Sequence, residues 1–247
     1  MTAYAPKMTA LSPGIVPNVA CINSASVPLE VDFDGLVATL QKFAETILFP
    51  VWGASAQVFK SERFVPGAWA MVFLDNANNQ NTLGYHDLTP DGLPLSKIFV
   101  ESTLKVAQKV SVTACHELAE MLIDPATNLV STASTNRPTK TFYAYEICDA
   151  VEEEEFEVDG IPMCDFVYPS WFESFHRPGS TQFDYLKKIG RPFEILPGGY
   201  MPVFRRGKWT QIFGSKAKEK RFRREDRRGH RSTYRDHPRA KRSRPSP

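Results

Sequence analysis

The stretch CHELAE, residues 115–120, decides how the rest of the chain is interpreted. It lies within residues 110–123, whose apolar side chains predict a helix that is buried on much of its circumference. Residues four apart in a helix share one face, so His116 and Glu120 can point at one ion. Imidazole nitrogen and carboxylate oxygen are both ligands of Zn²⁺. The stretch therefore predicts a metal site on a buried helix.

Upstream of this helix the sequence predicts another helix and several strands. Leu36, Leu40 and Phe43 share one face of a helix expected over residues 34–48, with Asp34 as its cap and Pro50 at its end. The strand-like stretches are residues 57–64, 68–74, 83–86 and 95–100. The second of these is continuously apolar, which is typical of a buried central strand. The last two are expected to pair.

The second half of the chain is rich in loops and aromatic residues. Its expected strands are residues 141–147, 156–158, 161–163, 200–204 and 209–213. One helix, several strands, the motif helix and then loops give an α+β order rather than regular β-α-β alternation. We therefore expect an α+β fold with a loop-rich second half.

Charge divides the 247-residue chain, although its net charge is only +2. Residues 215–247 hold 14 Lys or Arg and 4 Asp or Glu, whereas the remainder is acidic. We expect an extended arm over residues 1–28, one domain over 29–214, and a basic, partly disordered tail over 215–247. The acidic run at 152–155 is interpreted as a solvated face.

The motif and its surroundings resemble the zincin metallopeptidases, over about residues 30–175. In that family a helix packs on a twisted sheet, an edge strand binds extended substrate, and the next helix carries His-Glu-x-x-His. Here residues 84–100 would supply the edge strand. The resemblance therefore implies a twisted mixed sheet that carries residues 110–123 as the active-site helix. The chain also resembles a group of phage and bacterial proteins, without an assigned activity, that share the His-Glu-x-x-Glu segment and a later Glu-x-Cys-Asp.

The resemblance implies roles for individual residues. Glu117 would be the general base that acts on a metal-activated water. Glu120 stands where zincins have their second histidine, so the ligands are richer in oxygen, and Mn²⁺ or Fe²⁺ could replace Zn²⁺. The third ligand would come from a later segment, with Glu146 slightly ahead of Asp149; Asp124 is a weaker option. Whichever of the two acidic residues is not a ligand could orient His116.

Two functions follow as expectations. The first is a zinc-dependent, peptidase-like hydrolase that acts on a peptide or protein. The second is a non-catalytic zincin-like module, associated with a virion or with nucleic acid, whose metal site is structural or vestigial. The four cysteines are expected to be reduced, as in a cytoplasmic or virion-associated protein, and no stretch is apolar enough to span a membrane.

The basic tail could bind nucleic acid, because Lys and Arg neutralise phosphates and release counterions. A solubilising role, and contact with an acidic partner or with the acidic body of this chain, remain alternatives. A helix is expected over residues 215–228. The candidate phosphate contacts are Lys216, Lys218, Lys220, Arg221, Arg223, Arg224, Arg227 and Arg228.

Overall fold

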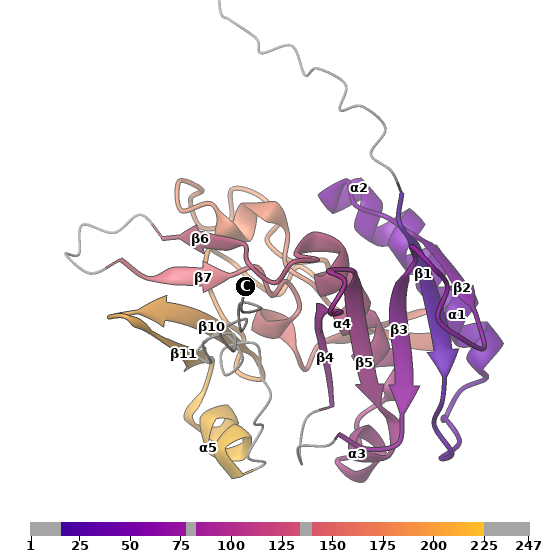
Figure 1. Cartoon of the computed structure of the whole chain (residues 1–247). Coiled ribbons are helices and arrows are strands. Elements are labelled where there is room, and N and C mark those ends of the chain that lie inside the picture. Colours follow the sequence, from indigo (N-terminus) through magenta and orange to yellow (C-terminus); the bar gives the residue numbers. More distant parts are fainter. Residues whose placement is uncertain (1–15, 78–82, 134–139, 225–247) are drawn as a thin grey trace, which may run out of the picture.

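The structure is a computed structural model that describes residues 16–77, 83–133 and 140–224 (Figure 1). It confirms a mixed α+β fold in which strands outnumber helices. The described strands form a five-stranded sheet, a four-stranded sheet and a two-stranded hairpin. Within these same ranges, every helix is too short or too polar to cross a membrane.

The five-stranded sheet is mixed, as predicted. Its strands are β1 (Asn18–Asn23), β2 (Gln57–Lys60), β3 (Trp69–Leu74), β4 (Gly84–Leu88) and β5 (Pro94–Phe99). They lie in the order β2-β1-β3-β5-β4, and β4 alone among them runs antiparallel to its neighbour. The apolar run of β3 is central in the sheet, which explains its continuous burial. Strand β4 is an edge strand.

The segment expected to be an extended arm contributes β1 to this sheet. Val19, Ala20 and Cys21 are fully buried, and β1 pairs in parallel with both β2 and β3. The arm expectation is therefore wrong for residues 18–23. The apolar run is only a few residues long and follows Pro17, so the sequence around it looks like a loop, and its burial comes from two distant strands. Residues 1–15 lie outside the described residues.

The first helical run begins one residue before the predicted start and continues past the predicted end at residue 48, although α1 itself is shorter. Helix α1 spans Phe33–Phe43, and its cap is Asp32 rather than Asp34, with the Gly35 N–H donating to the Asp32 carboxylate over 2.8 Å. A π-helical turn, Ala44–Leu48, leads into α2, Phe49–Trp52. Pro50 does not stop the helix because it lies in the first turn of α2, where a backbone N–H is not needed.

The motif helix α4 spans Val110–Ile123, the predicted bounds. It follows the short helix α3, Val100–Lys105, and packs against β4, β5 and α1 on one face of the sheet. One core joins residues of α1 and α4 to the side chains of Met71, Phe73 and Ile98 on that face. The N-terminus of α4 is capped from a distance, because Glu30 accepts hydrogen bonds from the backbone N–H groups of Val110 and Ser111.

The second half of the chain covers the other side of α4. Its antiparallel sheet has the order β11-β10-β7-β6, and a hairpin of two further strands packs on α4 through β9. The strands are β6 (Val130–Thr132), β7 (Phe142–Ala144), β8 (Glu155–Val158), β9 (Ile161–Cys164), β10 (Tyr200–Arg205) and β11 (Lys208–Phe213). The short 3₁₀ helices η2 (Asp149–Val151) and η3 (Pro169–Phe172) lie between them, and α5 (Lys216–Arg224) follows β11.

Two buried aspartates organise the loops of this half. Asp165 accepts hydrogen bonds from the backbone N–H groups of Phe166 and Leu186, over 2.7 and 3.3 Å. Asp184 accepts them from Lys188 and Ile189, both over 2.9 Å. These side chains replace the ladder hydrogen bonds that a loop lacks. Burial, and the negative charge of Asp184, raise the pKa of Asp165 to about 8.

We predict that Glu30→Ala lowers the free energy of unfolding by about 1 to 2 kcal/mol, because two N–H groups at the start of α4 lose a charged acceptor. Urea denaturation measures the change. Glu62→Ala is the control, since Glu62 is exposed, and it should change stability by less than about 0.5 kcal/mol. Equal stability of the two variants would contradict the capping role of Glu30.

We predict that Asp165→Asn removes part of the pH dependence of stability. An aspartate titrates at about pH 3.9 in an unfolded chain, whereas the folded pKa is about 8. The folded state therefore binds this proton more tightly than the unfolded chain does. Proton binding by Asp165 stabilises the fold fully at low pH, and this stabilisation is lost as pH rises through the folded pKa. Asparagine mimics the protonated carboxyl, so the free energy of unfolding of the variant should increase relative to that of the wild type as pH rises. Urea denaturation at about pH 5 and about pH 8 measures this; parallel curves would contradict it.

Candidate metal centre

Helix α4 carries three polar residues into the interior. The side chains of His116, Glu117 and Glu120 are 14%, 9% and 4% exposed, although ionisable residues are seldom buried in this way. The sheet covers one side of the helix, and the segment between β7 and η2 covers another. That segment brings Glu146, and the start of η2 brings Asp149, to the same helix; the two residues are 2% and 1% exposed. Buried ionisable groups gathered in one place are the mark of a functional site.

The first triad joins His116, Glu120 and Asp149. The Nε2 atom of His116 lies 3.3 Å from Oε2 of Glu120 and 3.4 Å from Oδ1 of Asp149. One ligand atom from each of the three residues lies within 4.8 Å of the other two, so the triad could hold a metal ion. This grouping joins the predicted pair on α4 to Asp149, the alternative that the sequence placed second.

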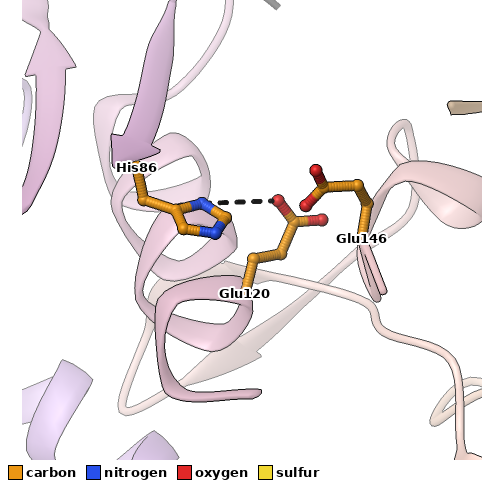
Figure 2. Close-up of side chains that lie close together, drawn as sticks. All are labelled: His86, Glu120 and Glu146. Atoms are coloured by element: carbon orange, nitrogen blue, oxygen red, sulfur yellow. Dashed lines mark ion pairs between the residues drawn. The ribbon is translucent and has the colours of Figure 1, made fainter. Parts of the chain in front are cut away.

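The second triad joins Glu120 to Glu146 and to His86 of β4 (Figure 2). Here too, one ligand atom per residue lies within 4.8 Å of the others. The Nδ1 atom of His86 lies 4.0 Å from Oε2 of Glu120, and the same nitrogen lies 3.4 Å from Oε2 of Glu117. The structure therefore places Glu146 beside Glu120, as the sequence predicted, but with His86 instead of His116.

Sequence reasoning assigned His86 to the substrate-binding edge strand and missed it as a candidate ligand. Side chains alternate along a strand, and His86 pairs with Ser96, two residues before the buried Ile98. It therefore faces α4 together with Ile98. Alternation along β4 could have shown that His86 shares a face with Gly84, but which face is covered by α4 depends on packing.

Without a metal ion, the charges of the first triad favour proton binding, so they raise the pKa of its residues. Burial acts to lower the pKa of His116, but the charge of Glu120 and the bond to Asp149 outweigh it and raise the pKa well above the usual range. Burial, and the charge of Glu120, raise the pKa of Asp149 to about 7. The carboxylates repel one another, and positive charge between them relieves that repulsion.

Glu120 is held from the second half of the chain. Its Oε1 atom accepts a hydrogen bond from the backbone N–H of Cys148 over 3.1 Å, which leaves Oε2 directed toward the two histidines. Asp124, the weaker ligand option, instead accepts the backbone N–H groups of Asn128 and Leu129, both over 2.9 Å. Asp124 thus fixes the loop that follows α4.

Three cysteines lie directly behind the motif. The Sγ atom of Cys164 is 3.1 Å from that of Cys115 and 3.6 Å from that of Cys148. They are buried free thiols, and so is Cys21. Burial raises the pKa of each thiol, and the four side chains pack as small apolar residues.

The basic helix α5 packs on the chain's own acidic run. Lys218 is only 3% exposed and forms ion pairs with Glu152 and Glu153, and Arg221 pairs with Glu153. Phe222, one turn after Lys218, is buried against Tyr200 and Phe213. The acidic run is therefore not only a solvated face. Lys218 is too buried to contact phosphate, whereas the side chain of Arg221 is 47% exposed.

Phosphate contact by the other candidate residues stays a prediction. Lys216, Lys220 and Arg223 are exposed, with Arg223 paired to Glu219 of the same helix. Arg224 ends α5, and the structure gives no account of its side chain. Arg227 and Arg228 lie outside the described residues.

We predict that Gly84→Ala destabilises the fold by about 1 to 3 kcal/mol, because a side chain at this position overpacks the site. A Cβ atom at residue 84 would lie 2.8 Å from Cγ of Glu117 and 3.1 Å from Cγ2 of Thr113. Gly190→Ala is the control, since the nearest atom there is 3.6 Å away. Urea denaturation of both variants tests the close approach of β4 to α4; a Gly84→Ala protein as stable as the control would contradict it.

Comparisons with protein families, with curated proteins and with solved structures gave no match to this chain. Its function must therefore be inferred from the chemistry of its own residues. The observation that any function has to explain is the meeting of two histidines and four carboxylates in the interior. Those residues are His86, His116, Glu117, Glu120, Glu146 and Asp149.

Proposed function

We propose that this protein is a metal-dependent, peptidase-like hydrolase with a zincin-like fold. His116, Glu120 and Asp149 would hold a divalent cation, and Glu117 would act beside it. The observation that carries the proposal is the first triad, in which one imidazole and two carboxylates from α4 and η2 bring their ligand atoms within 4.8 Å of one another.

The distances within the triad support a cation better than they support direct ion pairs. Charged N–H···O hydrogen bonds are usually about 2.7 to 2.9 Å long. His116 instead lies 3.3 and 3.4 Å from its two carboxylates. Ligands at about 2.0 to 2.1 Å from a tetrahedral ion are about 3.4 Å apart, so these spacings suit the edges of a coordination shell.

The fold supports the zincin-like part of the proposal. Helix α1 packs on a mixed sheet, β4 forms an antiparallel edge, and α4, which carries the motif, lies against that edge. This is the arrangement that the resemblance to zincins implies. An extended peptide could add to the outer side of β4 through backbone hydrogen bonds, which would bring its carbonyl groups past the site.

A bound divalent cation would supply Lewis acidity, which lowers the pKa of a water molecule. Glu117 would accept a proton from that water, and general-base assistance of this kind contributes about 10²- to 10⁴-fold to a rate. His86, 3.4 Å from Oε2 of Glu117, would orient the carboxylate or share its proton. One histidine and two carboxylates suit Zn²⁺, and the oxygen-rich set also admits Mn²⁺ or Fe²⁺.

A structural metal site in a non-catalytic module is the second candidate, and burial favours it. Structural sites are closed by protein ligands, whereas catalytic sites keep a position open to water. The side chains of Glu120 and Asp149 are 4% and 2% exposed, and that of His116 is 14% exposed. Both candidate functions require a bound cation. They differ in whether Glu117 acts as a general base.

We predict that His116→Ala loses bound metal, because it removes the only nitrogen ligand of the first triad. Elemental analysis of the purified full chain measures metal per chain. His176→Ala is the matched control, since His176 pairs with Glu173 on a partly exposed loop, and it should retain the wild-type content. A metal content in His116→Ala as high as in the wild type, or no metal in either protein, would overturn the proposed site.

We predict that Glu117→Gln retains the metal and loses peptide hydrolysis by about 10²-fold or more, because the amide cannot accept a proton. Cleavage of a mixed fluorogenic peptide library at saturating Zn²⁺, and again at saturating Mn²⁺, measures the change. A wild-type protein that holds metal without cleaving any peptide, and that melts earlier once a chelator removes the metal, would establish the structural role instead.

A further inference from the structure

The second triad, like the first, is formed by side chains from separate parts of the chain. His86 comes from β4, Glu120 from α4 and Glu146 from the segment after β7, so three separate parts of the chain converge (Figure 2). The three residues are 7%, 3% and 2% exposed. Burying ionisable groups is costly unless they are paired or bind an ion, so a position facing the core would otherwise favour an apolar residue.

Glu120 lies between the two histidines. Its Oε2 atom is 3.3 Å from Nε2 of His116 and 4.0 Å from Nδ1 of His86. Its other oxygen, Oε1, accepts the Cys148 N–H, so the carboxylate is fixed in this orientation. Glu120 therefore faces one histidine in each triad, and each triad adds a further acidic residue. A carboxylate in this position can bridge two cations.

Charge supports a second cation as well. The interior holds the carboxyl groups of Glu117, Glu120, Glu146 and Asp149. The two imidazoles can contribute at most two positive charges against these four groups. One divalent ion in the first triad would be balanced by Glu120 and Asp149 alone, which leaves Glu117 and Glu146 with His86. A second divalent ion would balance that remainder.

We propose that His86, Glu120 and Glu146 bind a second divalent cation, and that Glu120 bridges it to the cation of the first triad. This inference rests on the proposed function and deepens it, since the centre would hold two ions rather than one. Ions that share a carboxylate can stabilise both the attacking and the leaving oxygen of a hydrolysis. With four carboxylates and two imidazoles, the centre suits Mn²⁺ or Fe²⁺ as well as Zn²⁺.

Mn²⁺ titration of the full chain tests the stoichiometry. Equilibrium dialysis should give two Mn²⁺ per wild-type chain, one per chain in His86→Ala and in His116→Ala, and two in the His176→Ala control. Glu120→Gln should lose affinity for both ions, while its amide oxygen can still accept the Cys148 N–H. Glu146→Gln is a second variant of the same triad that keeps the side-chain volume, so the test does not depend on His86→Ala folding.

Electron paramagnetic resonance tests the bridge. Two Mn²⁺ ions joined by Glu120 are spin-coupled, so the six-line signal of isolated Mn²⁺ should be lost in the wild type and should return in Glu146→Gln. A single ion that is lost in His116→Ala, but kept in His86→Ala and Glu146→Gln, would overturn the second site and leave the proposed function intact. Two uncoupled ions would overturn the bridge, and the absence of any bound ion would overturn both proposals.

Discussion

The hydrogen bond from the Cys148 N–H to the Glu120 carboxylate joins the two halves of the molecule at their most polar point. On one side, α4 packs against the sheet built by the first hundred residues. On the other, the segment around η2 brings its own acids to the same helix. A carboxylate buried in this place requires compensation, and the N–H of Cys148 supplies part of it. The imidazoles of His116 and His86, 3.3 and 4.0 Å from its Oε2 atom, face the same carboxylate.

The sequence predicted the parts of the fold that depend on local pattern. The bounds of α4 were confirmed because its apolar residues and the following Asp124–Pro125 pair are strong signals. The pairing of β4 with β5 was confirmed as well, because a turn signal lies between them. β1 was missed because its few apolar residues gain their burial from two distant strands.

Only the part of the candidate site that lies on helix α4 could be predicted from the spacing of residues. His116, Glu117 and Glu120 follow from helical spacing, and a downstream acidic ligand was expected from resemblance. The pairing of Asp149 with His116, and of Glu146 with His86, depends on how β4 and η2 dock on α4, which no spacing in the chain encodes. The tail shows the same limit: Lys218 and Phe222 are one turn apart, but the acidic surface they pack on is distant in sequence.

The two triads draw their ligands from a strand, a helix and a loop that are far apart along the chain. An ion bound there would cross-link these segments only in the folded chain, whereas a disulfide restricts the unfolded chain as well. The midpoint of thermal unfolding should then rise with the concentration of free ion by mass action. Metal supply would in that case set how much of the protein is folded, independently of whether the site turns over a substrate.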